Sequence, residues 1–308
     1  MRKNKVLAIL ILLVLLIGTL FTGCGEQMAF GEAKIKYKTE NGESTVREVP
    51  NKSTLLSVEI PDTYEDCPVT AIADFAAVNL ENVETIYIGK NVRAIGTWAF
   101  ANNQKLQAIK VSAENPYFCD VDGVLFTKDM KTLLFYPPAR DKQTKTEADA
   151  NGAQTKTEFI EYTIPDGVET VRTKAFYKCQ SLTKVTMPDS VTRIEEKAFF
   201  RCALKELNLP ASLEFIGKDA FSYCGSLQTV EIPASIRQID EYAFYNCTSL
   251  KSVTVNAAES DITLGEKWYP TDNGRNLDGL EVHWASKKKE NKRTGGFKHT
   301  LKAAGLFV

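Results

Sequence analysis

The chain has 308 residues, of which 44% are hydrophobic and 25% charged, and its net charge is −1 at pH 7. Residues 24–284 combine 28 basic with 38 acidic residues, a balance that argues against nucleic acid as a partner of this part of the protein. The only two histidines, His283 and His299, lie close to the C-terminus. A histidine-based catalytic triad or metal cluster in the preceding part of the chain is therefore excluded.

The N-terminal segment predicts export from the cytoplasm. Three basic residues within the first five are followed by an apolar run that ends at Phe21, and small residues precede Cys24. This order is typical of a secretory signal peptide over residues 1–23. Its end resembles the lipobox of bacterial lipoproteins, which implies that Cys24 becomes an acylated mature N-terminus. The alternative is an uncleaved signal anchor.

Residues 24–54 are predicted to form an N-terminal hairpin cap. The segment from Ile35 to Val49 centres on Asn41-Gly42, a dipeptide that favours the tight turn of a two-stranded hairpin.

The central part of the chain, residues 55–256, repeats one motif. From Phe159 onward, prolines recur at separations of 23, 22 and 23 residues, and phenylalanines move in the same steps. These two columns are Pro165, Pro188, Pro210 and Pro233, and Phe176, Phe199, Phe221 and Phe244. Diverged copies begin at Leu55 and Val83, and the second of these has Phe100 in the phenylalanine column. Several columns that move together predict a solenoid of stacked coils.

One repeat shows why the coils must stack. Leu207 and Leu209 are two residues apart and lie on one face of a short strand, with Asn208 opposite. Pro210 cannot donate a backbone hydrogen bond and ends the strand. Phe221 then closes the coil on its apolar side. Because a single coil cannot cover this side, we expect the phenylalanine column to form a continuous interior.

Two segments interrupt the repeats. Residues 112–140 are predicted to be a hairpin insertion, with Gly123–Phe126 paired to Thr132–Tyr136. Residues 141–158 are polar and lack apolar periodicity, so they are predicted to be a flexible loop.

The motif resembles the BspA-like subtype of bacterial leucine-rich repeats, with units of the form L-x-x-V-x-I-P followed by A-F-x-x-C. The resemblance covers about Leu55 to Val255. It implies an α/β solenoid, a right-handed stack of short parallel strands with short helical or turn returns. Residues 257–284 would form the C-terminal cap that an exposed last coil requires. Residues 285–308 are a basic tail with seven Lys or Arg and one Glu.

Four cysteines share one column of the repeat: Cys179, Cys202, Cys224 and Cys247. A regular column favours structural thiols that satisfy turn backbone over a disulfide framework, and the diverged repeat has Asn103 in the same place. Disulfides between adjacent coils remain the alternative. The sequence does not indicate a redox state for Cys67 and Cys119.

No motif in the sequence indicates catalysis or a cofactor, and we expect no enzymatic activity. The acidic segments 120–123 and 272–278 faintly resemble calcium loops but lack the remaining ligand spacing, so acid-rich turns are the favoured interpretation.

Two surfaces are candidates for binding. The outward face of the strands presents one residue from each coil: Tyr87, Lys110, Thr163, Thr186, Asn208, Glu231 and Thr254. A second candidate is the aromatic residue that follows each repeat phenylalanine: Tyr177, Phe200, Tyr223 and Tyr245. The alternative for this second group is packing over the corner of the coil.

The resemblance implies a lipid-anchored, adhesin-like binding protein on the outer side of a bacterial cell membrane. Its partner would be an extracellular protein or polysaccharide. The alternatives are a structural spacer or envelope-assembly component without a specific ligand, and a surface enzyme. The sequence indicates no oligomeric state. The basic tail is expected to be a solvated end or a weak electrostatic contact with an anionic polymer.

Overall fold

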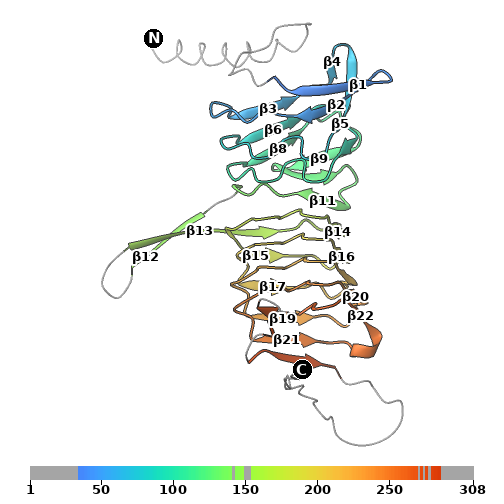
Figure 1. Cartoon of the computed structure of the whole chain (residues 1–308). Helices are drawn as coiled ribbons and strands as arrows, with labels where there is room; N and C mark the ends of the chain where they lie inside the picture. Colours follow the sequence, from blue (N-terminus) through green and yellow to red (C-terminus); the bar gives the residue numbers. More distant parts are fainter. Residues whose placement is uncertain are drawn as a thin grey trace, which may run out of the picture. The chain divides into compact units, whose positions relative to one another are not determined.

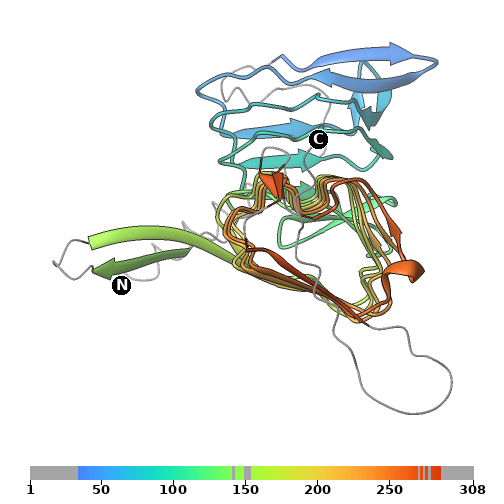
Figure 2. The same ribbon diagram turned by 60° about the horizontal axis from the view of Figure 1, so that its bottom comes forward.

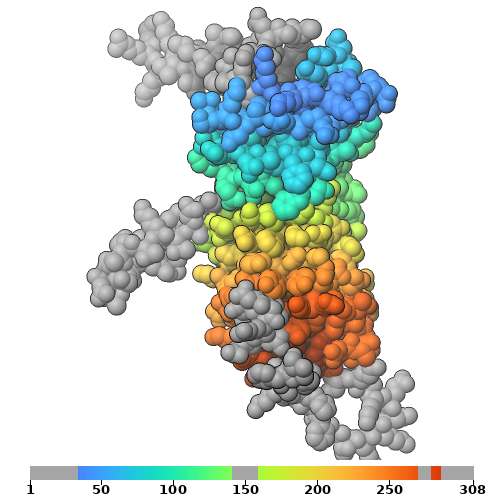
Figure 3. All heavy atoms as spheres, viewed as in Figure 1, coloured from blue at the N-terminus to red at the C-terminus, as the bar shows by residue number. Residues whose placement is uncertain are grey.

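Alternation of apolar and polar residues makes the first segment of each repeat a short strand with one buried face. In the computed structural model, which describes residues 34–140, 143–148, 154–269, 271–272, 275–276 and 279–285, these strands stack into a parallel β-solenoid of about nine coils (Figure 1). Successive coils form successive bands along the stack (Figure 3). The predictions for Cys24 and for residues 286–308 lie outside the described residues. Within them, no helix has the length and apolarity needed to cross a membrane.

The first side of each coil is the strand of the leucine segment. The three N-terminal strands of this side form one parallel sheet, and six further strands form another. They are β3 (Ser57–Ile60), β6 (Thr85–Ile88) and β8 (Ala108–Val111), then β13 (Gln154–Thr163), β15 (Leu182–Thr186), β17 (Glu206–Asn208), β19 (Thr229–Ile232), β21 (Ser252–Val255) and β25 (Glu281–Trp284). Apolar residues at every second position point inward from these strands.

The second side follows the proline turn and consists mainly of two-residue strands. These are β7 (Ala94–Ile95), β14 (Thr170–Val171), β16 (Arg193–Ile194), β18 (Phe215–Ile216), β20 (Gln238–Ile239) and β22 (Thr263–Leu264). From β14 onward they pair in parallel, each with the equivalent residues of the next coil. Viewed from the end of the stack, the C-terminal coils superpose on one another (Figure 2).

The third side, which we call the arc, corrects the expected helical returns. Among the described residues only η1 (Glu259–Asp261), a short 3-10 segment, is helical. In each arc the residue two before the repeat phenylalanine has a left-handed backbone, as in Lys174 (φ 63°) and Lys197 (φ 55°). A helix would direct every N–H into its own segment. Here alternate N–H groups point to the next coil, so the arc cannot be helical.

Two small hairpins lie at the N-terminal end. β1 (Lys36–Glu40) pairs antiparallel with β2 (Glu43–Glu48) across Asn41 and Gly42, which both have positive φ. β2 then lies parallel to β5 (Cys67–Ile72), the second-side strand of the first coil. β4 (Thr63–Tyr64) pairs antiparallel with β5.

The insertion between the two groups of coils is a three-stranded meander. β10 (Val124–Thr127) pairs antiparallel with both β9 (Phe118–Val121) and β11 (Thr132–Phe135). The interior consists of two clusters of buried side chains, and the meander contributes to both. Leu125 and Leu134 belong to the N-terminal cluster, whereas Phe126 and Leu133 belong to the C-terminal one. The insertion therefore separates two cores.

A second correction concerns residues 141–158, expected to be a flexible loop. β12 (Gln143–Ala148) instead pairs antiparallel with the first part of β13, and the hairpin projects from the stack (Figure 1). Threonines alternate with other polar residues in both segments. β-Branched residues favour strands even where neither face is apolar, so a search for apolar periodicity misses this hairpin.

The C-terminal end continues the repeat. β25 pairs in parallel with β21, and β22 extends the second side. A short hairpin of β23 (Thr271–Asp272) and β24 (Arg275–Asn276) lies between them in sequence. Trp268 is 5% exposed and packs edge-on against Trp284. Two large rings therefore help to cover the last coil.

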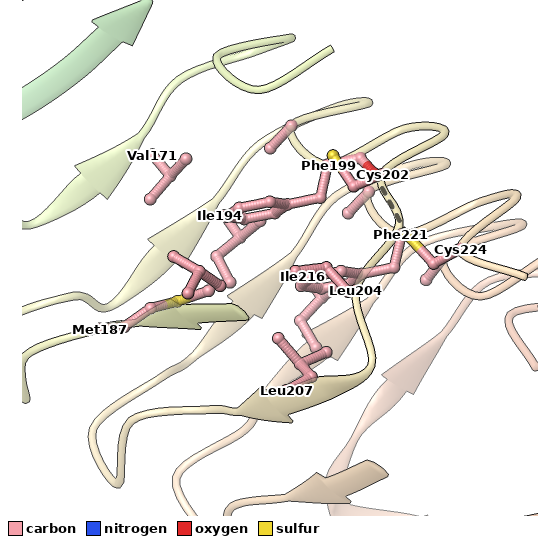
Figure 4. Packing of buried hydrophobic residues seen from close by; sticks show 14 of the residues in the cluster. Val171, Met187, Ile194, Phe199, Cys202, Leu204, Leu207, Ile216, Phe221 and Cys224 are labelled. Atoms are coloured by element: carbon pink, nitrogen blue, oxygen red, sulfur yellow. Dashed lines mark hydrogen bonds between the residues drawn. The ribbon is translucent and has the colours of Figure 1, made fainter. Parts of the chain in front are cut away.

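The repeat phenylalanines form the centre of the larger core. Phe199 and Phe221 are fully buried, and their parallel rings lie 5.2 Å apart (Figure 4). The same stacking continues to Phe176 at 4.7 Å and to Phe244 at 5.2 Å. Phe100 is 3% exposed but belongs to the N-terminal core.

Replacement of Phe221 by Ala should lower the free energy of unfolding by ~3–5 kcal/mol, because it removes a buried ring and leaves a cavity. Hydrogen exchange should lose protection first in the coils of Phe199 and Phe244, since coils couple only to their neighbours. Phe215→Ala is the matched control. Phe215 is only partly buried, so its replacement should lower the free energy of unfolding much less. Equal destabilisation by both substitutions would contradict the assigned interior.

Candidate binding surfaces

The outward strand residues form two aligned rows. Strand register places Tyr87 beside Lys110 in the first sheet. In the second sheet the register joins Thr163, Thr186, Asn208, Glu231 and Thr254 in one line. The rows also contain Glu59, next to Tyr87, and His283, next to Thr254, which were not predicted from the sequence. Both residues occupy the outward position of an alternating strand, β3 or β25, and this alternation could have predicted them.

The strand face offers little to a partner. Tyr87, with 49% exposure, is the one exposed large hydrophobic residue of these rows in the described part of the chain. Lys110 binds Asp120 at 3.1 Å, and Lys184 binds Glu206 at 3.3 Å. Binding hot spots usually centre on clustered aromatic or arginine side chains, and this face lacks such a cluster among its described residues.

The arc side presents a continuous line of aromatic rings, which we call the aromatic ridge. Its members are Phe75, Trp98, Tyr177, Phe200, Tyr223 and Tyr245. Tyr177 and Phe200 stack at 5.3 Å, Phe200 and Tyr223 lie 5.3 Å apart edge to face, and Tyr223 and Tyr245 lie 5.6 Å apart. The sequence indicated four of these rings, while Phe75 and Trp98 come from another column.

The arc backbone explains why these rings face outward. Tyr177, Phe200 and Tyr245 each directly follow a buried repeat phenylalanine, and adjacent side chains point to opposite sides of the chain. Tyr223 lies two residues after Phe221 and is one of the left-handed residues of its arc (φ 63°). Phe75 is 58% exposed and Tyr223 is 36% exposed, while Trp98 and Tyr177 are partly buried. The rings therefore pack against one another and still present edges to solvent, so that packing and binding are compatible.

Cationic side chains accompany the ridge. Lys174 lies 3.8 Å from the centre of the Trp98 ring, and the Arg201 guanidinium lies 5.0 Å from that of Tyr223. Lys178 donates a 3.1 Å hydrogen bond to Asn102 Oδ1. In the described part of the chain no carboxylate lies within 4 Å of these three cations. Partial burial lowers the pKa of Lys174 and raises the pKa of Tyr177. The ridge thus carries positive charge that is not held in close ion pairs, although Glu196 and Asp74 are near enough to Lys174 to act on its charge.

Neighbouring lysines differ in this respect. Lys197 binds Asp219 at 3.2 Å and Glu196 at 2.7 Å, and Lys218 binds Glu241. These pairs neutralise the flank of the ridge, so the free cations are concentrated around Trp98, Tyr177 and Tyr223.

A pocket of about 280 Å³ lies at the ridge between the two groups of coils, where Trp98 and Tyr177 meet. Its walls come from the arc of 95–102 on one side and from Arg172, Thr173, Lys174 and Tyr177 on the other. The insertion supplies apolar side chains, including Leu134 and Phe135. We call this cavity the corner pocket.

The cysteine column satisfies backbone carbonyls. Cys224 Sγ donates to the carbonyl of Phe199 at 3.3 Å (Figure 4), and Cys202 and Cys247 contact the carbonyls of Phe176 and Phe221 in the same way. Asn103 donates to the Ala77 carbonyl at 2.8 Å. None of the six cysteines in the described part of the chain takes part in a disulfide.

The acidic turn at 120–123 serves the backbone. Asp120 accepts hydrogen bonds from the N–H groups of Val111 at 2.8 Å and Gly123 at 3.2 Å, in addition to its ion pair with Lys110. No group of three potential metal ligands occurs among the described residues.

Comparison with known proteins identifies the repeats. A family model for the BspA type leucine rich repeat region, in six copies, matches residues 50–120 and 151–266. The pneumococcal vaccine antigen PcpA has a similar structure, with 22% identity and a TM-score of 0.58 over 77% of this chain and 58% of that one. A leucine-rich repeat protein from Eubacterium ventriosum shows 19% identity and a TM-score of 0.53 over 82% of each chain. Our chain thus spans little more than half the length of the pneumococcal structure. No curated protein matches.

The column thiols should resist alkylation in the native protein at pH 8. Complete burial raises the pKa of Cys224 to about 12 and holds the pKa values of Cys202 and Cys247 well above their usual range. Mass spectrometry of native and unfolded samples should show labelling of the column only after unfolding. Because the pKa values of these thiols are higher in the folded protein than in the unfolded chain, their contribution to the free energy of unfolding is complete below pH ~9. This contribution is lost as the pH rises toward the folded pKa values. Recovery of a disulfide between Cys202 and Cys224 would contradict this prediction.

Proposed function

The chain belongs to the BspA-type leucine-rich repeat family, and from this premise we propose that it is a surface binding protein whose aromatic ridge holds an acidic polysaccharide. The observation that carries the proposal is the combination of ring edges with Lys174, Lys178 and Arg201, which have no carboxylate partner within 4 Å among the described residues. The proposal includes no catalytic step.

The ridge is favoured over the strand face by its chemistry. Rings that recur at 5.3–5.6 Å provide a long, rigid apolar surface at little cost in side-chain entropy. Cations beside such rings attract carboxylate or sulfate groups, and Arg201 can bind them with two parallel hydrogen bonds. A polymer with repeated sugar faces and repeated negative charges matches this repetition along the stack.

Location outside the cell follows from the predicted signal peptide and from lipid attachment at Cys24. The pneumococcal neighbour is described as a vaccine antigen, which agrees with a location outside the cell. A protein held on the membrane and extended as a solenoid would carry the ridge into the space where polysaccharides occur.

Binding of the purified protein to immobilised alginate, with dextran as the uncharged control, tests the ridge. Arg201→Gln should weaken alginate binding about two- to five-fold, and Tyr223→Ala by a similar factor. Increasing salt should weaken binding further, because exposed charges are screened within ~10 Å at 0.1 M ionic strength.

Thr186→Ala on the strand face is the matched control and should leave the affinity unchanged. Loss of binding by this variant alone would transfer the site to the strand face. Absence of any alginate binding would leave the structural-spacer alternative as the better account.

Lipid attachment can be tested separately. Cys24→Ala should abolish incorporation of a labelled fatty acid and release the protein from the membrane fraction. Each buried methylene contributes ~0.8 kcal/mol, and stable anchoring requires about two chains. Unchanged fractionation of the variant would indicate an uncleaved signal anchor instead.

A further inference from the structure

The arcs of adjacent coils are joined by a regular set of hydrogen bonds. Alternate N–H groups of one arc donate to carbonyls of the next: Lys197 to Lys218 at 2.9 Å, Phe199 to Ala220 at 2.8 Å, and Arg201 to Ser222 at 2.9 Å. One edge of every arc is therefore made of donors and the opposite edge of acceptors.

The insertion does not complete this set of hydrogen bonds, because the segment that takes the place of an arc is two residues shorter than in a regular coil. Leu133 pairs with Val171, and Tyr136 donates to the Ala175 carbonyl at 2.9 Å while its ring stacks on Phe176 at 4.9 Å. Tyr136 thus stands in the phenylalanine column. Only two residues connect Leu133 to Tyr136, whereas four connect Val171 to Phe176.

Proline removes a further hydrogen bond. Pro138 follows Tyr136 by two residues, the position that Lys178 has relative to Phe176, and it has no N–H to donate. The insertion therefore donates to the following arc only at the Ala175 carbonyl. The backbone groups on either side of this hydrogen bond lack the partners that they have in a regular arc.

The result is an open donor edge and an open acceptor edge facing the corner pocket. Among the described residues, no group accepts from the N–H of Trp98, Phe100 or Asn102, although the preceding arc uses all three equivalent N–H groups. No described group donates to the carbonyls of Thr173 or Tyr177. All five residues line the pocket.

We propose that the corner pocket binds a short peptide that completes the missing corner of the coil. Its carbonyls would accept from the N–H groups of Trp98 and Phe100, and one of its N–H groups would donate to the Thr173 carbonyl. A peptide is favoured because the deficit is two residues of backbone and because the two walls require donors on one side of the ligand and acceptors on the other. The pocket shares Trp98, Lys174 and Tyr177 with the ridge, whereas Arg201 and Tyr223, which the polysaccharide test alters, lie outside it.

The flanking arcs define the preferred peptide. Trp98 and Lys174, the equivalent residues on either side, have φ values of 61° and 63°. Glycine adopts this backbone without a steric cost, and a D-residue prefers it, whereas a β-branched L-residue is strongly disfavoured. Ala99 and Ala175 follow these positions. The pocket should therefore select glycine or a D-residue followed by alanine.

Side chains around the pocket agree with a small ligand. Leu125, Leu134 and Phe135 provide an apolar floor. Trp98 and Tyr177 also line the pocket, and their ring centres lie 4.4 Å apart, edge to face. A short peptide with a small side chain fits such a cavity better than a bulky one does.

Three capped tripeptides test the proposal: threonine–glycine–alanine, threonine–D-alanine–alanine and threonine–valine–alanine. Calorimetry with the full protein should show binding of the first two, with the valine peptide about ten-fold weaker. Residue-resolved hydrogen exchange supplies an independent measurement. In the free protein the Trp98, Phe100 and Asn102 amides should exchange faster than those of Lys197, Phe199 and Arg201. Saturating glycine peptide should slow exchange of the Trp98 and Phe100 amides about ten-fold or more.

Ala101→Phe should fill the pocket with a ring like those of Tyr177 and Phe200 in the same column, and should abolish peptide binding. Tyr245→Ala, on the ridge but outside the pocket, should leave peptide affinity unchanged. If Ala101→Phe does not fold, hydrogen exchange of the unaltered protein with and without the glycine peptide still tests the proposal. No protection of the Trp98 and Phe100 amides by the glycine peptide, or equal affinity for the valine peptide, would overturn the proposal.

Discussion

The structure depends on one constraint: each coil must satisfy its backbone polar groups with the coil that follows it. Two sides of the coil do so as ordinary parallel strands. The arc side uses two left-handed residues in every repeat, such as Lys174 and Lys178, and each costs ~1–2 kcal/mol when it is not glycine. Interior stacking of Phe176, Phe199, Phe221 and Phe244, together with thiols that donate to arc carbonyls, offsets this cost. Continuity along the axis is therefore both the source of stability and the condition for it.

The insertion shows what happens when continuity is partly lost. Tyr136 preserves the phenylalanine column and one arc hydrogen bond, and β11 preserves the second side. The shortened corner does not preserve the other arc hydrogen bonds, and the interior divides into two clusters. The corner pocket is the consequence of this compromise. It places unpaired backbone groups beside Trp98 and Tyr177, in the middle of the aromatic ridge.

The fold and the surface chemistry have different origins. Family membership accounts for the stack, while the ridge depends on which side chains occupy outward positions of the arc. The aromatic residues just after the repeat phenylalanines, Tyr177, Phe200, Tyr223 and Tyr245, were recognisable in the sequence, but their role was open between packing and binding. Ring contacts at 5.3–5.6 Å and the nearby unpaired cations show that both uses are compatible. The strand rows were also predicted from the sequence. The ion pairs that neutralise Lys110 and Lys184 on this face could not be predicted from it.

The sequence by itself determined the repeat, its register, the parallel strands and the family, because columns spaced 22 and 23 residues apart specify which residues must be neighbours. Only the tertiary structure decided the form of the returns and the fate of 141–158. The helical returns were wrong because alternate arc N–H groups bond to the next coil, a choice that involves two coils at once. The polar hairpin β12–β13 was missed because its alternation lies in β-branching and not in hydrophobicity. The corner pocket arises from a two-residue difference between segments that are distant in sequence, and such a difference becomes a cavity only when the coils are stacked.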